Sequence, residues 1–422
     1  MKRIEPVKKP LRGAVVVPGD KSITHRAVML ASVAQGRSRI FNLSSGDDNS
    51  RTVRALRQLG VEIYRSADAL CVDGRGWDGL RESREVLDCG NSGTTMRLMS
   101  GLLAGRPFHS KLDGDGSLRE RPMQRIIDPL SLMGATIVSK KGNGLAPLEI
   151  FGDRLHGIRY LMPIASAQVK SAILLAGLQA TGTTTVEEPC RSRDHTEVML
   201  KGFGCRVRTE GNSVTLDGEQ NLGARDVRIP GDLSSAAFFL VAAATVPGSD
   251  IMIRNVGCNP TRDGIIEILR RMGASIELMN ERSEAGERVA DIRVLGSVLR
   301  GVEVEPELAP RTIDEYPVLS IAAALADGVT TFLGVKELRF KESDRIAAMS
   351  EGLGRLGVKV DEFDDGMTIL GGRGLRGGAV RSFGDHRVAM AFAVGALSGG
   401  GAIEIDDARC ADISFPTFFD LM

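Results

Sequence analysis

The amino-acid sequence predicts an α/β protein of two domains, each built from three copies of a repeated unit. Three observations lead to this prediction. The chain of 422 residues is long enough for two or three domains with cores of their own. Its 50 glycines and only 4% aromatic residues are typical of many tight turns and layers of small side chains. A block made of a polar turn and an apolar, small-residue helix recurs six times.

The six blocks follow one another at intervals of about 65 to 82 residues, longer than the period of the common solenoid repeats. They are GDKSITHRAVMLASVA from Gly19, CGNSGTTMRLMSGLLAG from Cys89, IASAQVKSAILLAGLQA from Ile164, PGDLSSAAFFLVAAATV from Pro230, TIDEYPVLSIAAALADG from Thr312 and FGDHRVAMAFAVGALSG from Phe383. Each unit is therefore large enough for a small layer of sheet and helix.

A second pattern alternates with the first. It reads LRQLGVEI from Leu56, LSLMGATI from Leu130, LKGFGCRV from Leu200, LRRMGASI from Leu269 and LGRLGVKV from Leu353. Each copy predicts the end of an amphipathic helix, a glycine that stops it, and a β-branched strand. Short alternating runs such as SVTLDG and GMTILGG predict further strands closed by turns. Six such units divide as three plus three, with the polar helix starts expected to line a cleft.

Charge and cysteine usage limit the classes of function. Lys plus Arg and Asp plus Glu both number 54, and a net charge of zero argues against nucleic acid or an acidic membrane as the main partner. The six cysteines are far apart and favour reduced thiols over disulfides or a zinc site. The basic N-terminus lacks the apolar stretch of a signal peptide, and the run from Ala236 to Ala244 is too short to span a membrane. We expect a cytoplasmic protein.

Cations accompany several of the predicted helix starts. Lys21 and Arg26 flank the first, Arg97 lies just inside the second, and Arg387 lies at the sixth. A cation is unfavourable at the positive end of a helix unless an anion binds there, so the recurrence favours a shared polyanionic ligand. The alternative is that the polar starts are ordinary helix caps and the cations are solvated surface residues.

Two glycine-rich stretches are candidates for anion binding. The turn CGNSGTTMRL from Cys89 offers backbone N–H groups to a phosphate or carboxylate but lacks the ending of a Walker A loop. DGDGSLRERP from Asp113 is not a calcium loop, because Leu118 stands where an EF-hand requires glycine. It brings Arg119, Arg121 and Arg125 together, which predicts an arginine fork for phosphate, with a solvated turn as the alternative.

Carboxylates occur among these cations. Asp314 and Glu315 open an apolar helix, where they act either as caps or, in a cationic cleft, as proton-transfer groups. The run KESDRI, residues 341–346, has the same two interpretations, surface ion pairs or site residues. No nucleophile elbow is present, and the five histidines lack metal-ligand spacing, so neither a metal nor another cofactor is expected. The pattern indicates a transferase for a small, highly anionic substrate pair.

Together these stretches closely resemble the family of 5-enolpyruvylshikimate-3-phosphate (EPSP) synthases, in the second of its two sequence classes. The matching segments are PGDKSITHRA, CGNSGTTMRL, DGDGSLRERPM, ASAQVKSAILLAGL, SRDHTEVML, PGDLSSAAFFL, IDEYPVLS, LRFKESDRI, GDHRVAMA and SFPTFF, in the family's order from residue 17 to 419. The resemblance implies an inside-out α/β barrel in two domains, built from six βαβαββ-type units. The implied domains are residues 20–228 and residues 1–19 plus 229–422, with the active site in the cleft between them.

The resemblance also implies the reaction and the partners. The enolpyruvyl group of phosphoenolpyruvate is transferred to the 5-hydroxyl of shikimate 3-phosphate and phosphate is released, a shikimate-pathway step toward the aromatic amino acids. A monomer is expected, with no nucleic acid and no membrane as partner. One alternative is a UDP-N-acetylglucosamine enolpyruvyl transferase, which carries a loop cysteine and a Lys-Asn pair where this chain has no cysteine and has Lys21-Ser22. Another is a non-catalytic, anion-binding repeat protein.

The family's functional residues carry over by motif. Asp314 matches the proton acceptor at the attacking hydroxyl, and either Glu342 or Lys21 is suited to protonate C3 of the enol. The residues implied for shikimate 3-phosphate are Lys21, Ser22, Arg26, Ser166, Gln168, Arg193, Asp314 and Lys341. Those implied for phosphoenolpyruvate are Lys21, Asn91, Gly93, Thr94, Arg121, Arg345 and Arg387.

Three positions bear on the rim of this site. Ala167 stands where the first class carries a second serine, and Ile413 stands where that class uses a lysine near phosphoenolpyruvate. Gly93 keeps the small residue in the loop where the inhibitor glyphosate competes. We therefore expect the enzyme to be sensitive to glyphosate.

Overall fold

The six helices predicted from the repeated blocks are all present in the computed structural model, which describes residues 1–422. They are α1 Lys21–Ser32, α3 Gly93–Ala104, α5 Ala167–Gly177, α7 Leu233–Thr245, α10 Tyr316–Leu325 and α12 His386–Ser398. Beyond their first turns these helices are buried on nearly every side, as expected for helices that are apolar all round. None of the helices has the length and apolar character needed to span a bilayer.

Small side chains let these helices pack closely. A Cβ atom added at Gly101 on α3 would lie 2.1 Å from the main-chain oxygen of Ala172 on α5, so the two backbones touch there. α3 packs against α5, and α12 packs against α7 and α10. This explains why the repeated blocks are rich in glycine, alanine and serine.

The five glycine-stopped helices are also confirmed. They are α2 Asp47–Gln58, α4 Gln124–Leu132, α6 His195–Gly202, α8 Gly264–Arg271 and α11 Arg345–Arg355. The glycines that follow them, Gly60, Gly134, Gly204, Gly273 and Gly357, all have φ between +85° and +106°, where a side chain would be strained. The next strands are β4 Glu62–Ser66, β8 Thr136–Ser139, β12 Val207–Glu210, β17 Ser275–Glu284 and β21 Lys359–Phe363.

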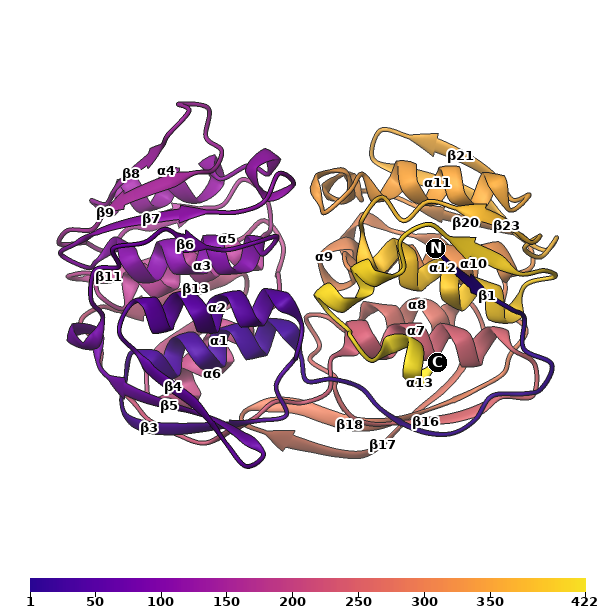
Figure 1. Ribbon diagram of the computed structural model, residues 1–422, viewed down its shortest axis with the longest axis horizontal. Helices are drawn as coiled ribbons and strands as arrows, with labels where there is room; N and C mark the ends of the chain where they lie inside the picture. Colours follow the sequence, from indigo (N-terminus) through magenta and orange to yellow (C-terminus); the bar gives the residue numbers. More distant parts are fainter. The chain divides into compact units, whose positions relative to one another are not determined.

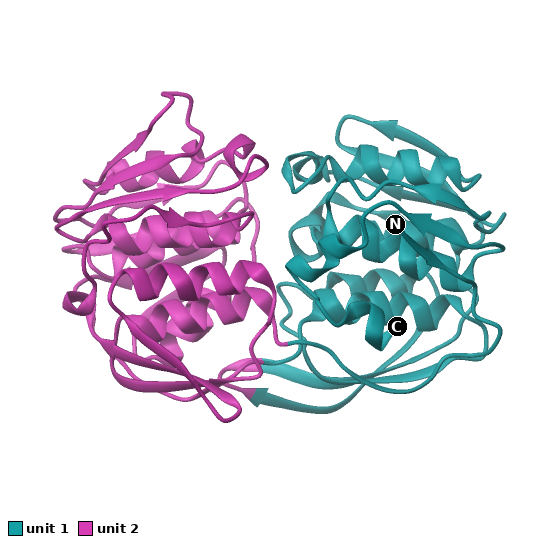
Figure 2. Ribbon diagram, in the orientation of Figure 1, with its two compact units in different colours: residues 1–18, 230–283, 288–422 teal, residues 19–229, 284–287 magenta.

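The chain divides into two units (Figure 2). Unit 1 comprises Met1–Pro18, Pro230–Ser283 and Arg288–Met422, and unit 2 comprises Gly19–Ile229 with Glu284–Glu287. Each unit has a separate hydrophobic core, which the buried helices of that unit share with the inner faces of its sheets. Each unit is therefore stabilised mainly by burial of its own apolar side chains.

Unit 2 contains three open sheets (Figure 1). Their orders are β14-β3-β5-β4, β6-β7-β9-β8 and β10-β11-β13-β12, with β15 also pairing with β3. The remaining bounds are β3 Ala34–Phe41, β5 Ala69–Arg75, β6 Leu87–Asp88, β7 His109–Asp113, β9 Leu148–Phe151, β10 Arg159–Leu161, β11 Thr183–Glu187, β13 Ser213–Asp217, β14 Leu222–Gly223 and β15 Val227–Arg228. In each sheet a hairpin pairs antiparallel with a central strand, and a short parallel strand completes the other edge.

Unit 1 contains three further open sheets, of which two repeat this pattern: β2-β16-β18-β17 and β19-β20-β22-β21. In the third, β23-β24-β1, the N-terminal strand takes the place of the hairpin, with Lys2 opposite Ile405. The remaining bounds are β1 Lys2–Ile4, β2 Arg12–Val16, β16 Asp250–Gly257, β18 Glu287–Leu295, β19 Glu303–Val304, β20 Val329–Phe332, β22 Gly366–Leu370, β23 Gly378–Val380, β24 Ile403–Ile405, α9 Ala309–Thr312 and α13 Phe418–Leu421. The N-terminal strand thus completes a sheet whose other strands come from the C-terminal part of the chain.

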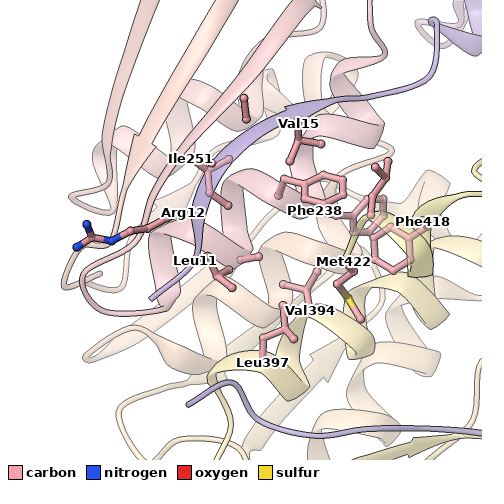
Figure 3. A pocket seen from close by; sticks show the side chains of 14 residues that line it. Leu11, Arg12, Val15, Phe238, Ile251, Val394, Leu397, Phe418 and Met422 are labelled. Atoms are coloured by element: carbon pink, nitrogen blue, oxygen red, sulfur yellow. The ribbon is translucent and has the colours of Figure 1, made fainter. Parts of the chain in front are cut away.

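A cavity of about 250 Å³ lies in unit 1, beside β2 and the C-terminal helix α13 (Figure 3). Phe238, Val394 and Phe418 line it, with Met422 from the chain end. Its wall includes none of the residues predicted for the active site, so the search for that site turns to the polar helix starts.

Candidate active site

Most of the polar helix starts are genuine caps. The side chains of Asp20, Ser92, Ser166, Asp232 and Asp385 each accept a hydrogen bond from a backbone N–H in the first turn of their helix. Each such cap is worth about 1 kcal/mol. The start of α10 differs, because Glu315 occupies the cap position without making that bond. Capping therefore explains the short polar residues and leaves the cations beside them to be explained.

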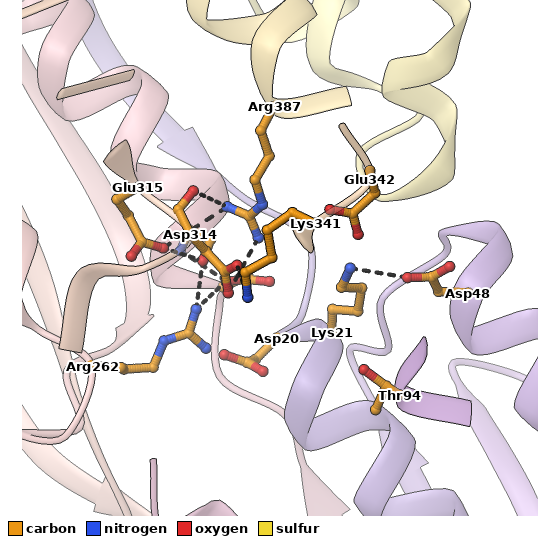
Figure 4. A network of polar contacts seen from close by, with 12 residues as sticks. Asp20, Lys21, Asp48, Thr94, Arg262, Asp314, Glu315, Lys341, Glu342 and Arg387 are labelled. Atoms are coloured by element: carbon orange, nitrogen blue, oxygen red, sulfur yellow. Dashed lines mark hydrogen bonds and ion pairs between the residues drawn. The ribbon is translucent and has the colours of Figure 1, made fainter. Parts of the chain in front are cut away.

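In unit 2, α1 carries two cations with different environments. The Lys21 ammonium lies 3.0 Å from a carboxylate oxygen of Asp48 and remains partly open to solvent (Figure 4). Arg26 is buried, and its Nη1 donates to the main-chain oxygen of Ser22 at 2.9 Å. These contacts hold Lys21, Ser22 and Arg26 on one side of the first two turns of the helix.

Two further helices hold the Arg26 guanidinium. Its Nε donates to the hydroxyl of Thr196 on α6 and its Nη2 donates to the hydroxyl of Ser171 on α5, both at 2.7 Å. The pKa of Arg26 is lowered to about 10, mainly by burial; the charge of Glu197 opposes this shift and the nearby charge of Arg193 contributes to it. Two guanidinium groups that oppose each other's charge in this way form a natural site for an anion.

The glycine-flanked turn before α3 is held by Arg121. Its Nη1 donates to the main-chain oxygen of Asn91 at 3.1 Å, and its Nη2 donates to the Asn91 side chain at 2.6 Å. On the same turn Thr94 accepts a hydrogen bond from Gln168 of α5 at 2.9 Å. A Cβ atom at Gly93 would lie 2.9 Å from Arg97 Nη1, so that guanidinium would have to shift to accept a side chain here.

The predicted fork of three arginines is wrong for Arg119. Its guanidinium forms two hydrogen bonds with Asp113, at 2.9 and 2.6 Å, on the exposed side of the loop. Arg121, two residues later, is buried against the turn at Asn91. Arg119 lies within a 3₁₀ turn, Leu118–Glu120, and Arg121 directly follows it, so the two side chains reach different partners.

In unit 1, cations surround the carboxylate of Asp314. Its oxygens lie 4.0 Å from the Lys341 ammonium, 3.6 Å from Arg345 Nη1 and 3.9 Å from Arg387 Nη2. Arg387 also donates to the main-chain oxygen of Asp314 at 2.9 Å (Figure 4). Asp314 lies two residues before α10, ahead of the cap position that Glu315 occupies, and its carboxylate is turned toward cations from two other segments.

Arg345 is the most buried cation of this group. Its Nε lies 2.8 Å from Asp385 and its Nη2 lies 2.7 Å from Glu342. Burial by itself lowers the pKa of Arg345, but the charges of Asp385 and Glu342 outweigh it and raise the pKa above its ordinary value. For Asp385, burial acts to raise the pKa of the carboxyl group. The charge of Arg345 more than offsets this effect, so the pKa of Asp385 lies below its ordinary value.

The predicted site residues fall into two sets. Unit 2 carries Lys21, Ser22, Arg26, Asn91, Gly93, Thr94, Arg121, Ser166, Gln168 and Arg193, and unit 1 carries Asp314, Lys341, Glu342, Arg345 and Arg387. Contacts link Gln168 to Thr94 and Arg121 to Asn91 in unit 2, and Asp314 to three of the cations in unit 1. Each unit thus carries a connected set of polar residues at the starts of its helices.

Several residues that support these sets were not assigned to the site from the sequence. Asp48 pairs with Lys21, Asp385 pairs with Arg345, and Ser171 and Thr196 hold Arg26. Asp385 could have been found from the sequence, because it stands at a predicted helix start, as Asp20 does. Ser171 and Thr196 have none, since their partner lies more than 140 residues away in the chain.

The position of Ile413 has a structural explanation. Ile413 ends a 3₁₀ turn, Arg409–Ile413, and packs against the core of unit 1. An apolar side chain suits that contact, whereas the lysine of the first class would bring a charge to it. The six cysteines are all free, and no cluster of His, Cys, Asp and Glu is placed to hold a metal.

Comparison with known proteins gives consistent matches over the whole chain. Residues 6–422 match the family described as EPSP synthase (3-phosphoshikimate 1-carboxyvinyltransferase). The chain is 52% identical over 412 residues to a 3-phosphoshikimate 1-carboxyvinyltransferase of Pelobacter propionicus, covering 98% of this chain and 96% of the relative. It is 53% identical over 409 residues to one of Desulforudis audaxviator, covering 97% and 95%. The solved structure of an EPSP synthase from Acinetobacter baumannii matches with a TM-score of 0.89 at 45% identity, over 99% of this chain and 96% of that one.

Proposed function

The chain belongs to the EPSP synthase family, and from that premise we propose how its residues carry out the transfer. The enzyme is a 3-phosphoshikimate 1-carboxyvinyltransferase, which moves the enolpyruvyl group of phosphoenolpyruvate to the 5-hydroxyl of shikimate 3-phosphate and releases phosphate. The two substrates bring two phosphates and two carboxylates. Cations are therefore needed to hold them side by side.

Shikimate 3-phosphate binds to the helix starts of α1 and α5 and to the loop before α6. Arg193 and Ser166, at the start of α5, hold its phosphate and ring, and Arg26 contacts the same substrate. Ser22 and Gln168 orient the ring, and Lys341 approaches it. Support comes from the opposed charges of Arg26 and Arg193, which an anionic substrate beside them would relieve.

Phosphoenolpyruvate binds to two clusters of cations. The first is Arg121 with the turn at Asn91, Gly93 and Thr94, where the backbone can approach an anion because residue 93 has no side chain. Arg345 and Arg387 supply the second, and Lys21 reaches both substrates. Arginine suits this role because its planar fork matches carboxylate and phosphate oxygens.

The reaction proceeds by addition and elimination. Asp314 accepts the proton of the 5-hydroxyl as its oxygen attacks C2 of phosphoenolpyruvate, and Glu342 or Lys21 delivers a proton to C3. The tetrahedral adduct then loses that C3 proton and phosphate, which restores the double bond. The arginines stabilise the departing phosphate.

The observation that carries this assignment is the position of Asp314. Its carboxylate has three cations within 4.0 Å and stands at a helix start that it does not cap. These contacts orient the carboxylate, and a proton acceptor must be positioned in this way.

A phosphate-release assay tests the function directly. Phosphate is expected to appear when phosphoenolpyruvate is mixed with shikimate 3-phosphate, and not when it is mixed with UDP-N-acetylglucosamine. Release with the nucleotide sugar alone would overturn the proposal in favour of the other enolpyruvyl transferase. Release with neither would favour a non-catalytic protein that binds anions.

We also propose the finer architecture that the resemblance implies. The six repeats form an inside-out α/β barrel of βαβαββ-type units, and residues 20–228 and 1–19 plus 229–422 act as two domains that close on the substrates. The three sheets of each unit support this proposal. Small-angle scattering should show a smaller radius of gyration with both substrates present, and no change would contradict closure.

The enzyme is further proposed to act as a monomer in the cytoplasm. Its six free cysteines suit a reducing compartment. Sedimentation of the purified protein over a range of concentrations tests the oligomeric state, and a constant mass of one chain, 45.2 kDa, is expected.

A further inference from the structure

A lysine in the middle of unit 2 is completely buried among carboxylates. Lys170, on the second turn of α5, has a side chain only 1% exposed. Its ammonium lies 2.7 Å from Glu188 and 2.7 Å from Glu197. It also donates to the main-chain oxygen of Ser192 at 3.3 Å. The ammonium thus donates hydrogen bonds to Glu188 and to Ser192, and it forms an ion pair with Glu197.

Glu188 extends this cluster to the loop that carries Arg193. The carboxylate of Glu188 accepts a hydrogen bond from the backbone N–H of Ser192 at 3.3 Å and another from its hydroxyl. Ser192 is therefore held through its N–H, its carbonyl oxygen and its side chain. Since Arg193 is the next residue, these bonds determine where the Arg193 backbone lies.

Glu197 connects the same cluster to Arg26. It lies on the first turn of α6, next to Thr196, whose hydroxyl accepts the hydrogen bond of Arg26 Nε at 2.7 Å. The charge of Glu197 also stabilises the charged form of Arg26. On α5, Ser171 follows Lys170 and holds Arg26 Nη2. The two arginines thus depend on one buried cluster.

Stability alone does not explain three buried charges. Their desolvation costs several kcal/mol for each ion, and apolar or neutral side chains of similar volume are often at least as stabilising. The cluster does place two residues whose positions matter for an anion.

We propose that Lys170, with Glu188 and Glu197, is a positioning residue that sets Arg193 and Arg26 where shikimate 3-phosphate requires them. This inference rests on the proposed function. Lys170 itself is not proposed to contact either substrate. Loss of the cluster should therefore weaken the binding of shikimate 3-phosphate and leave the phosphoenolpyruvate side of the reaction largely intact.

The test compares two variants with a control. The triple variant Lys170→Met, Glu188→Gln, Glu197→Gln removes all three charges together, while the charges of Asp20 and Glu287 remain to stabilise Arg26. Ser192→Ala removes only the hydroxyl that bonds to Glu188. The control, Lys201→Met, changes an exposed lysine on the same helix as Glu197. Calorimetry measures the Kd of shikimate 3-phosphate, steady-state kinetics measure both KM values, and circular dichroism with thermal unfolding checks the fold.

For the triple variant we expect a folded protein whose Kd for shikimate 3-phosphate is raised by about tenfold or more, the loss of roughly one charge-assisted hydrogen bond. Its KM for phosphoenolpyruvate, at saturating shikimate 3-phosphate, should change by less than about threefold, because the groups of that site are not displaced. Ser192→Ala should raise the same Kd by about threefold to tenfold at nearly unchanged Tm. The control should match the wild type.

The inference would be overturned if the folded triple variant showed an unchanged Kd for shikimate 3-phosphate, or equal changes in the KM values of both substrates. The cluster would then have only a structural role. If the triple variant does not fold, the same comparison of the Kd for shikimate 3-phosphate and the two KM values is made with Ser192→Ala. Failure of the wild type itself to bind shikimate 3-phosphate would overturn the proposed function and, with it, the inference. Wild-type binding combined with unaffected variants overturns the inference alone.

Discussion

Arg387 holds Asp314 by two groups at once: its Nη1 donates to the main-chain oxygen of Asp314 at 2.9 Å, and its Nη2 lies 3.9 Å from the carboxylate of the same residue. The aspartate and the arginine come from the starts of two different repeats, 73 residues apart. The contact therefore fixes the position of the proposed proton acceptor, Asp314, relative to Arg387, a cation proposed to bind phosphoenolpyruvate. Substitution of either residue is therefore expected to impair the proposed role of the other as well.

Asp314→Asn should lower kcat by about 10²–10⁴-fold, because the amide cannot accept the proton of the attacking hydroxyl. The KM values should change little, since the amide keeps nearly the shape of the carboxylate. Steady-state phosphate release measures both. Asp361→Asn, at an exposed position on β21, is the matched control and should behave as the wild type. Substantial turnover by Asp314→Asn would remove Asp314 from the role of base.

Lys21→Ala should abolish turnover while the protein stays folded. Lys21 is proposed to touch both substrates, and its partner Asp48 lies in the first turn of α2, where the helix dipole stabilises a carboxylate that has lost its cation. The Tm should therefore fall by only a few degrees, as expected for a change of about 1 kcal/mol in the free energy of unfolding. Activity and thermal unfolding are compared with Lys140→Ala, an exposed lysine. Retained turnover would contradict the shared role of Lys21.

Arg345→Met should lower the free energy of unfolding by about 3–5 kcal/mol, because it leaves Asp385 and Glu342 without their buried cation. Urea denaturation measures the change. Arg355→Met, on the same helix, removes an exposed cation that pairs with Glu351, and its effect should stay within about 0.5 kcal/mol. Similar effects for the two variants would show that burial of Arg345 has no special weight.

Gly93→Ala should raise the KM for phosphoenolpyruvate and the inhibition constant of glyphosate together. The added Cβ would lie 2.9 Å from Arg97 Nη1 and 3.6 Å from Arg121 Nη1, so at least one guanidinium must move. The KM for shikimate 3-phosphate should be nearly unchanged. Gly116→Ala, at a loop position with no atom within 4 Å of the added Cβ, serves as the control. A wild-type enzyme that glyphosate does not inhibit would contradict the expectation drawn from Gly93.

His25→Asn should reduce the pH dependence of stability between pH 6.5 and 5. Burial, together with the charges of Lys21 and Arg26, lowers the pKa of His25 well below 6.5. Below pH 6.5 the unfolded chain binds a proton at this residue and the folded chain does not, so the free energy of unfolding falls as the pH falls, by about 1.4 kcal/mol per pH unit. The loss continues until the pH reaches the folded pKa.

Asparagine suits this test because its amide can replace His25 Nδ1 in the hydrogen bond with Thr52. Urea denaturation at several pH values should show a shallower slope for His25→Asn than for the wild type. His156→Asn, at an exposed histidine, should leave the slope unchanged. An identical slope for His25→Asn would mean that His25 is protonated in the folded protein.

Much of the fold follows from local signals in the sequence. The six small-residue helices were predictable because a polar cap and an apolar run leave few alternatives, and the five glycine stops because only glycine adopts φ near +90° without strain. The strand β1 gave no such signal. Its partner β24 lies about 400 residues away, and a three-residue strand has no pattern of its own to reveal that pairing.

The same limit applies to the site. Lys21, Arg26 and Arg387 stood out because a cation at a helix start is unusual, and Arg121 because it lies in a cluster of arginines. The sequence did not indicate that Arg119 pairs with Asp113, since spacing along a loop does not determine which way each side chain turns. Nor did it indicate the partners of Lys170, which come from a loop and a helix farther along the chain.

The sequence alone determined the repeat, the helix starts and the family, because each depends on residues that are near one another in the chain or on motifs in a fixed order. Only the tertiary structure decided the state of each charge. Whether a lysine or arginine is solvated, paired or buried depends on which distant segments pack against it, and burial changes the energy of a charge far more than its neighbours in sequence do. Three cations of unit 2 illustrate this, because only the packing of the chain gives them different environments. Arg119 lies on the surface, Arg121 lies at the turn and Lys170 lies in the interior.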